Sequence, residues 1–374
     1  MAAEKKRPRG LKGSVLAKSK KPKNNNDSTS QPTEIPENAQ TVVIDKEVEE
    51  GDELGETAAL LESALDKLES DSSEALPLLR GTIHESDRIL RNWDSENPLP
   101  ASFYYNYGVA LYELGRLIED EDFEPYLDAA EERLNDSLEH LEKEDNAELV
   151  SKVNVALAKV WFAKASSQVA DDSVPELAIR ALSTVDKTIS ESKLSSKVII
   201  ELADIAQNHG SLYTTLESRD KFITWAEKTL KQVLKDEPTN TQALSVLGLC
   251  KLQVAHYWLD SVEEGAEEEE EEKTELSKEE ENAYQAILES KKHLEAAHTE
   301  LVKSDKLTPQ ILTDLAEVYV NEGNLVLNEE EQNRIYERAV KLIKEAQSLV
   351  DEKKLDYALP EGLAAFLAEY EEEK

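Results

Sequence analysis

Residues 312–323 read LTDLAEVYVNEG, and their spacing is that of a helix packed closely against a second helix. Large apolar residues recur every three or four positions, with a small residue among them and a glycine at the end: Leu312, Leu315, Ala316, Tyr319 and Gly323. Residues at this spacing share one face of a helix. The small residue lets the partner helix approach, and this order is typical of the first helix of a tetratricopeptide repeat.

The same order recurs along the chain. It is found at Tyr104, Tyr107, Gly108, Leu111 and Gly115, at Ile199, Leu202, Ala203, Ala206 and Gly210, and more weakly at Leu244, Leu247, Gly248, Lys251 and Ala255 and at Val153, Ala156, Leu157 and Val160. The small-residue positions 108, 157, 203 and 248 are separated by 49, 46 and 45 residues, whereas a tetratricopeptide repeat has about 34. The surplus predicts that both helices of each hairpin are lengthened by whole turns. Ordinary helices with chance small residues are the alternative.

This register places Gly248 where the two helices of one hairpin touch. We therefore expect that alanine is tolerated at Gly248 and that valine forces the helices apart. Ala203 is expected at the equivalent place one repeat earlier, and Leu202 and Leu247 are predicted core residues.

The sequence predicts an all-α fold with two parts. Residues 53–374 are expected to form a superhelical array of lengthened tetratricopeptide-like hairpins, after a disordered basic and polar tail over residues 1–52. The step from Gly248 to Ala316 is 68 residues, and its surplus coincides with residues 262–278, which include six consecutive glutamates. We interpret residues 262–278 as an acidic loop inserted into a hairpin, either solvated or in contact with a basic partner.

Helix boundaries are marked by proline and by apolar periodicity. Proline is expected near the starts of three helices, at Pro175, Pro309 and Pro360. An N-terminal pair of helices is predicted over residues 53–69 and 73–93. A short closing helix is predicted to contain Leu363, Phe366 and Leu367.

The composition excludes several classes of protein. The chain of 374 residues has 43 Lys and Arg against 80 Asp and Glu, a formal net charge of −37, and a single cysteine. One cysteine rules out a disulfide framework, and no apolar run reaches the roughly 18–20 residues that a bilayer span needs. The basic N-terminus is not followed by the apolar segment of a secretory signal. These features predict a soluble intracellular protein.

The basic residues are concentrated at the N-terminus. Residues 1–26 hold nine basic residues and one acid, a net charge of +8, which leaves 34 basic and 79 acidic residues, a net charge of −45, for the rest of the chain. Two basic clusters about eleven residues apart predict a nuclear localisation signal read by an import receptor: Lys5, Lys6, Arg7, Arg9, Lys18, Lys20, Lys21 and Lys23. A solubilising or RNA-contacting tail is the alternative, although the acidic body disfavours direct nucleic-acid binding.

The search for catalytic or cofactor-binding motifs is negative. The sequence has no glycine-rich phosphate loop, no nucleophile elbow and no dinucleotide fingerprint. His84 and Glu85 begin like a zinc-protease helix, but the second histidine is missing, so neither a metal nor a cofactor is predicted. His84, Asp87 and Arg88 are expected to pair with a neighbouring helix. The chain is therefore predicted not to be an enzyme.

Two other features are assigned to the core. Cys250 lies between apolar residues of a predicted first helix, which indicates a buried, inert thiol. The aromatic residues Phe103, Tyr104, Tyr105, Tyr107 and Tyr112 are interpreted mostly as core, with a ligand cage as the alternative.

Three stretches resemble the fungal enhancer-of-translation-termination family. They are Lys6–Leu11 followed by Lys18–Lys21, then Gly81–Leu90, and then Leu315–Leu325. Within that family the chain is most similar to the fission-yeast branch that negatively regulates a prolyl-hydroxylase-like dioxygenase.

The resemblance implies a nuclear, all-helical, non-enzymatic protein. Such a protein would bind a 2-oxoglutarate/Fe(II) dioxygenase, inhibit it in low oxygen so that a sterol-regulatory transcription factor is stabilised, and help to import it. The two internal matches contain the candidate partner-binding residues His84, Asp87, Arg88, Glu317 and Asn324, for which packing is the alternative role. A factor promoting translation termination and an acidic chaperone for basic proteins such as histones are the other functions considered. An acid-driven complex would weaken more steeply with salt than a packed adaptor interface.

Overall fold

The computed structural model describes residues 46, 48–68, 72–94, 97–118, 123–143, 146–169, 173–263 and 274–372. These residues form thirteen α-helices, which confirms the all-α prediction. The chain divides into two compact units, Met1–Lys164 and Ala165–Lys374, which are described separately below. Most of the predicted tail lies outside the described residues, so the tail and its localisation signal stay predictions.

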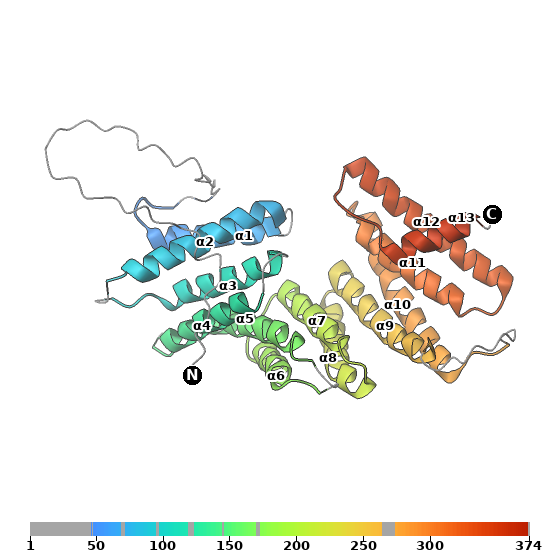
Figure 1. Ribbon diagram of the computed structural model, residues 1–374, viewed down its shortest axis with the longest axis horizontal. Coiled ribbons are helices and arrows are strands. Elements are labelled where there is room, and N and C mark those ends of the chain that lie inside the picture. Colours follow the sequence, from blue (N-terminus) through green and yellow to red (C-terminus); the bar gives the residue numbers. More distant parts are fainter. Residues whose placement is uncertain are drawn as a thin grey trace, which may run out of the picture. The chain divides into compact units, whose positions relative to one another are not determined.

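The first unit consists of consecutive antiparallel helices joined by short connections (Figure 1). Its members are α1 (Glu53–Leu68), α2 (Ser72–Asn92), α3 (Ala101–Leu117), α4 (Glu124–Leu141) and most of α5 (Ala147–Ser166). Helix α1 packs against α2, α3 packs against α4, and α2 contacts α3. The predicted N-terminal pair of helices is thereby confirmed.

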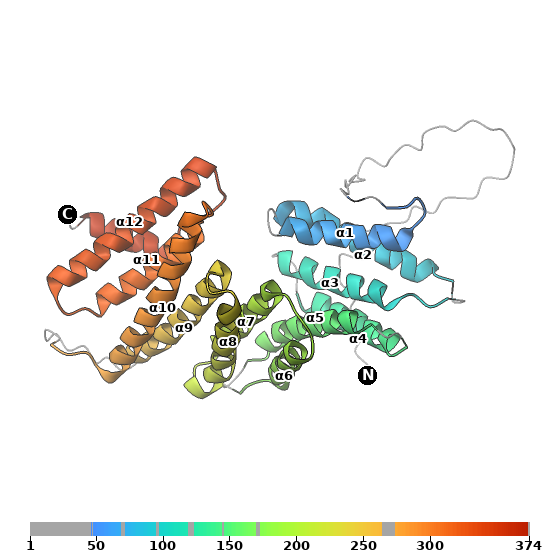
Figure 2. The same ribbon diagram turned by 180° about the vertical axis from the view of Figure 1, so that it is seen from behind.

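The second unit, taken by itself, contains three packed hairpins, as Figure 2 shows from the other side. Its helices are α6 (Glu176–Glu191), α7 (Ser196–Gly210), α8 (Leu216–Asp236), α9 (Thr241–Glu263), α10 (Lys278–Lys303), α11 (Pro309–Asn324), α12 (Glu329–Lys353) and α13 (Glu361–Glu372). The hairpins are α7–α8, α9–α10 and α11–α12, and the closing helix α13 rests on α11 and α12. The predicted helix starts near the three prolines are confirmed.

The buried positions follow the predicted hairpin register. Leu202, Ala203, Leu247 and Ala316 are all fully buried. The lengthening, however, falls on the second helix in two hairpins, because α7 ends at Gly210 and α11 ends at Asn324. Both helices are extended only in α9–α10, since α9 continues to Glu263. The prediction that both helices lengthen in every hairpin is therefore wrong.

Two glycines, one in each unit, lie where a leucine of the second helix approaches the first helix closely. A Cβ atom on Gly108 would lie 2.7 Å from Leu134 Cγ, and one on Gly248 would lie 2.6 Å from Leu294 Cγ. Such distances require a side chain or a helix to shift. The expectation that Gly248→Ala is tolerated is therefore wrong, because the facing residue is a buried leucine rather than a small residue.

The predicted acidic loop is shorter at both ends than residues 262–278. Helix α9 includes Val262, and α10 begins immediately after Ser277. The start of α10 is fixed by a capping box, in which Ser277 Oγ accepts from the Glu280 amide at 3.2 Å and the Ser277 amide donates to Glu280 Oε2 at 2.8 Å. Residues 264–273, with the six glutamates, lie outside the described residues.

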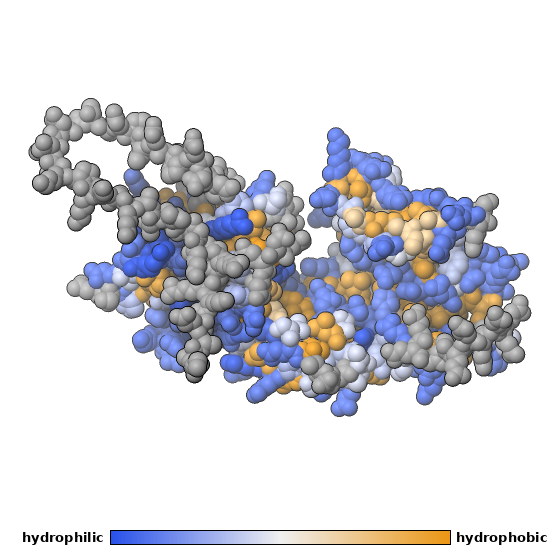
Figure 3. Space-filling view, viewed as in Figure 1, coloured by the Kyte–Doolittle hydropathy of each residue, from blue (hydrophilic) through white to orange (hydrophobic). Residues whose placement is uncertain are grey.

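Apolar residues are visible at several places on the face of the second unit that Figure 3 shows, and one group of them lies near α13. Helix α13 buries Leu363 and packs Phe366 and Leu367 partly against the core, as predicted for a closing helix.

Candidate partner-binding site

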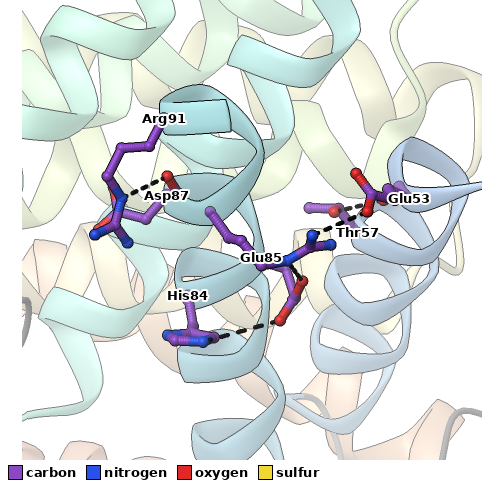
Figure 4. Close-up of polar contacts among 7 residues, drawn as sticks. Glu53, Thr57, His84, Glu85, Asp87 and Arg91 are labelled. Carbon is purple, nitrogen blue, oxygen red and sulfur yellow. Dashed lines mark hydrogen bonds and ion pairs between the residues drawn. The ribbon is translucent and has the colours of Figure 1, made fainter. Parts of the chain in front are cut away.

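Three of the five candidate residues lie on α2, where a guanidinium links two carboxylates. Arg88 Nε donates to Glu85 Oε2 at 2.6 Å, one turn earlier on α2, and Arg88 Nη1 donates to Glu53 Oε1 at 2.9 Å on α1 (Figure 4). The hydrogen bonds to Glu85 and then Glu53 raise the pKa of Arg88 above its ordinary value. Glu53 also opens α1, where a negative charge is favourable to the helix dipole. Arg88 therefore ties α2 to α1.

Asp87 connects α2 to α3. The Tyr107 hydroxyl donates to Asp87 Oδ1 at 2.5 Å, and Arg91 Nε donates to the Asp87 carbonyl oxygen at 3.0 Å. Burial, together with the bond to Asp87, raises the pKa of Tyr107 well above its ordinary value. Phe103, Tyr107 and Tyr112 are buried, which confirms the interpretation of these aromatic residues as core.

His84 does not take part in these links. Its side chain is 61% exposed, and its Nε2 lies 4.0 Å from Glu85 Oε1 of its own helix. Figure 4 shows the imidazole on the outside of α2, away from Asp87. The expected pairing with a neighbouring helix is thus confirmed for Asp87 and Arg88 and is wrong for His84. We call Glu53, Glu85, Asp87, Arg88 and Tyr107 the α2 cluster.

The other two candidates lie on α11, in the second unit. Glu317 Oε1 is 3.2 Å from His256 Nε2 on α9, and the Glu317 side chain is 42% exposed. Asn321, one turn later, places its Nδ2 3.5 Å from the same histidine nitrogen. Asn324 Oδ1 accepts a 2.7 Å hydrogen bond from the Tyr336 hydroxyl on α12.

The five candidates are therefore not one constellation. They form a group on α2 and a group on α11, each inside its own unit. The contacts that sequence reasoning missed are those from Glu53, Tyr107, His256 and Tyr336, because these partners lie on other helices. Only the pair of Glu85 and Arg88 has the i,i+3 spacing that a sequence can reveal.

The described residues contain neither a recognisable metal site nor a membrane-spanning helix. They contain no group of three or more His, Cys, Asp or Glu side chains that could hold a metal ion. Among the same residues, no helix is both long and apolar enough to cross a membrane. Cys250 is fully buried, as predicted, and burial raises the pKa of its thiol to about 12. A thiol in that state is a poor nucleophile.

Comparison with known proteins points to one group of fungal proteins. A family model described as nuclear pore complex subunit Nro1 matches residues 1–256. Enhancer of translation termination 1 from Yarrowia lipolytica is 27% identical over 335 residues, which cover 81% of this chain and 83% of that protein.

Two further matches are a shorter sequence match and a solved structure. The negative regulator of ofd1 from Schizosaccharomyces pombe is 36% identical over 124 residues, which cover 31% of this chain and 30% of that protein. The solved structure of the S. pombe nuclear import adaptor Nro1 has a TM-score of 0.50 at 20% identity, and the match covers 85% of this chain and 99% of that chain. At this identity the likeness shows a shared fold.

Proposed function

We propose, because the chain belongs to the Nro1 family, that it is a non-enzymatic adaptor that binds a prolyl-hydroxylase-like 2-oxoglutarate/Fe(II) dioxygenase. The adaptor inhibits the dioxygenase in low oxygen, stabilises a sterol-regulatory transcription factor and helps to import the enzyme through a nuclear import receptor. Family membership is the observation that carries this proposal, and it confirms the resemblance seen in the sequence. The relative from S. pombe named as a negative regulator of ofd1 supports the choice of partner.

The described contacts favour two of the five candidates as direct contacts of the dioxygenase. His84 and Glu317 have the more exposed side chains, at 61% and 42%, although Glu317 Oε1 also lies 3.2 Å from His256 Nε2 of α9. Asp87, Arg88 and Asn324 instead use their polar atoms to join neighbouring helices. We assign those three a role in holding the helices that present His84 and Glu317.

Calorimetric titration of the purified chain with the dioxygenase of the same organism tests this assignment. Glu317→Lys is expected to weaken binding by at least roughly tenfold, because it reverses a charge at the interface. Glu345→Lys makes the same charge change at an exposed position of α12 and is the matched control. No measurable binding by the unaltered chain would contradict the proposed function, and equal affinities of the two variants would contradict the assignment of Glu317.

Nuclear entry is proposed to depend on the basic tail. Replacing Lys5, Lys6, Arg7, Lys20 and Lys21 by alanine is expected to move the chain from nucleus to cytoplasm without lowering its melting temperature. Fluorescence microscopy of the tagged chain measures this. Continued nuclear accumulation of the substituted chain would contradict the role of the tail.

A role in translation termination is the second candidate, since the relative from Y. lipolytica carries that name. A stop-codon readthrough reporter in cells that lack the chain measures it. Increased readthrough that His84→Ala and Glu317→Lys variants both reverse would favour this role over dioxygenase binding.

A further inference from the structure

One face of the second unit carries carboxylates and amides in a repeated register. The residues that define this first-helix surface are Asp204 and Asn208 on α7, Gln253 and His256 on α9, and Gln310, Asp314, Glu317 and Asn321 on α11. Counted from the small residue of each helix, they occupy positions −6, −2, +1, +5 and +8, which fall within about 80° of one another around a helix. Helix α9 contacts both α7 and α11, so the three faces adjoin.

Two carboxylates of this surface have no cation beside them in the part of the chain that the structure describes, and Asp314 is buried while Asp204 is half-buried. Asp204 Oδ1 accepts from Gln207 Nε2 at 3.0 Å, and Asp314 Oδ1 accepts from Gln310 Nε2 at 2.6 Å. Among the described residues, neither carboxylate forms an ion pair. Burial raises the pKa of Asp204, and burial raises the pKa of Asp314 to about 6. A buried carboxylate without a counter-charge is unfavourable for the fold by itself.

A second observation concerns Gln207, beside Asp204, whose side-chain oxygen lacks a hydrogen-bond donor among the residues described. Gln207 is 1% exposed, and its Nε2 donates both to Asp204 and to Asn208. Its carbonyl oxygen Oε1 is buried and has no hydrogen-bond partner. Buried amide oxygens are almost always paired in folded proteins, so an orphan beside an unneutralised carboxylate indicates a site that a ligand completes.

The helices that form the surface supply little positive charge of their own. Helix α11 contains no Lys or Arg, and Lys251 of α9 is held by Glu227 of α8 and Glu289 of α10. Lys197, near the start of α7, falls on the same face in this register and is not free of partners. The amides of Asn208, Gln253 and Asn321 offer both donors and acceptors, as the backbone of an extended peptide requires.

We propose that the first-helix surface binds an extended segment of a partner protein that is rich in arginine or lysine. Guanidinium or ammonium groups would sit on Asp204 and Asp314 and bring donors to the Gln207 oxygen, while the amides hold the backbone of the segment. Adjacent helix axes lie about 8–10 Å apart, so the three helices span roughly 20 Å, or about six extended residues. This inference goes beyond the proposed function, because it concerns a second partner class and does not need the dioxygenase.

Fluorescence anisotropy with the full chain and labelled peptides tests the proposal. The probes are peptides of about twelve residues that alternate serine with arginine, with glutamine or with glutamate, at about 150 mM salt. The arginine peptide is expected to bind, and Asp204→Asn/Asp314→Asn should weaken it by roughly tenfold without lowering the melting temperature. Asp220→Asn/Asp236→Asn removes the same charge from exposed positions of α8 and should change the affinity less than about twofold.

Three outcomes would overturn the proposal. Equal losses in both double variants would mean that the peptide senses only the net charge of the chain. Equal binding of the glutamine peptide would mean that basic side chains are not recognised. Tighter binding of the arginine peptide after Lys5, Lys6, Arg7, Lys20 and Lys21 are replaced by alanine would assign the surface to the chain's own tail.

Discussion

The α2 cluster of the first unit and the first-helix surface of the second unit carry similar polar residues but differ in how these are paired. In the α2 cluster, Arg88 lies between two glutamates, and Asp87 receives a hydroxyl from another helix. On the first-helix surface, Asp204 and Asp314 receive only neutral amides of their own helix. Ion pairs and hydrogen bonds between helices stabilise the fold, whereas a carboxylate withdrawn from water without a counter-charge does not. This difference is why we propose a ligand for the first-helix surface and none for the α2 cluster.

The apolar packing of the two units does not differ in this way. Each unit contains a hairpin in which a glycine faces a buried leucine at a similarly close distance, Gly108 with Leu134 and Gly248 with Leu294. The comparison therefore predicts equal responses to core changes in the two units and opposite responses to polar changes.

The largest expected effect is on the apolar core. Leu111→Ala in the first unit and Leu247→Ala in the second should each lower the free energy of unfolding by about 2–5 kcal/mol, because both side chains are buried. Urea denaturation measures this. A loss in one unit alone would show that the two cores are not equivalent.

The second-largest expected effect is an increase in the free energy of unfolding. The folded-state pKa of Asp314 is raised from 3.8 to about 6, so its favourable contribution is complete below pH 3.8 and is lost as the pH rises through 6. Asp314→Asn should therefore stabilise the chain by up to about 3 kcal/mol at pH 7. The gain over the unaltered chain should shrink toward zero near pH 4. A destabilised variant at pH 7 would show that the carboxylate is paired in solution.

Close helix contacts should respond next. Gly108→Val and Gly248→Val should each cost about 1–3 kcal/mol, and the two alanine variants should cost less, since even a Cβ atom meets the facing leucine. Thermal unfolding of the four variants measures the series. Valine variants that match the unaltered chain would mean that the glycines do not set the helix spacing.

The smallest expected effect concerns the α2 cluster. Asp87→Ala leaves the Tyr107 hydroxyl without its acceptor, which should cost about 1 kcal/mol. Asp220→Ala, at an exposed position of α8, is the control and should be nearly neutral. Equal stabilities of the two variants would place Asp87 outside the network that holds α2 to α3.

Much of the fold could be predicted because helices obey local rules. The spacing of Leu202 and Ala203, and of Leu315 and Ala316, reveals which face is buried. What alanine does at Gly248 depends on Leu294, 46 residues later, and the sequence pattern does not say which side chain fills that space.

The candidate site could be predicted only in part, for the same reason. Arg88 and Glu85 share one helix, but Glu53 is 35 residues from Arg88 and Tyr107 is 20 residues from Asp87. Asp314 stands one turn before a predicted candidate, Glu317, and nothing in its neighbours shows that it is buried without a cation. The absence of a cation beside Asp314 can be recognised only from the structure, in which α9 and α11 pack together.

Amide hydrogen exchange of the full chain, with and without the arginine peptide, tests the central distinction most directly. The account predicts slower exchange in α7, α9 and α11 when the peptide is bound and unchanged exchange in α1 and α2. Protection confined to α2 and α3 would contradict it, because the α2 cluster would then bind the basic peptide. Protection confined to residues 264–273 would also contradict it, because the acidic segment would then bind the peptide.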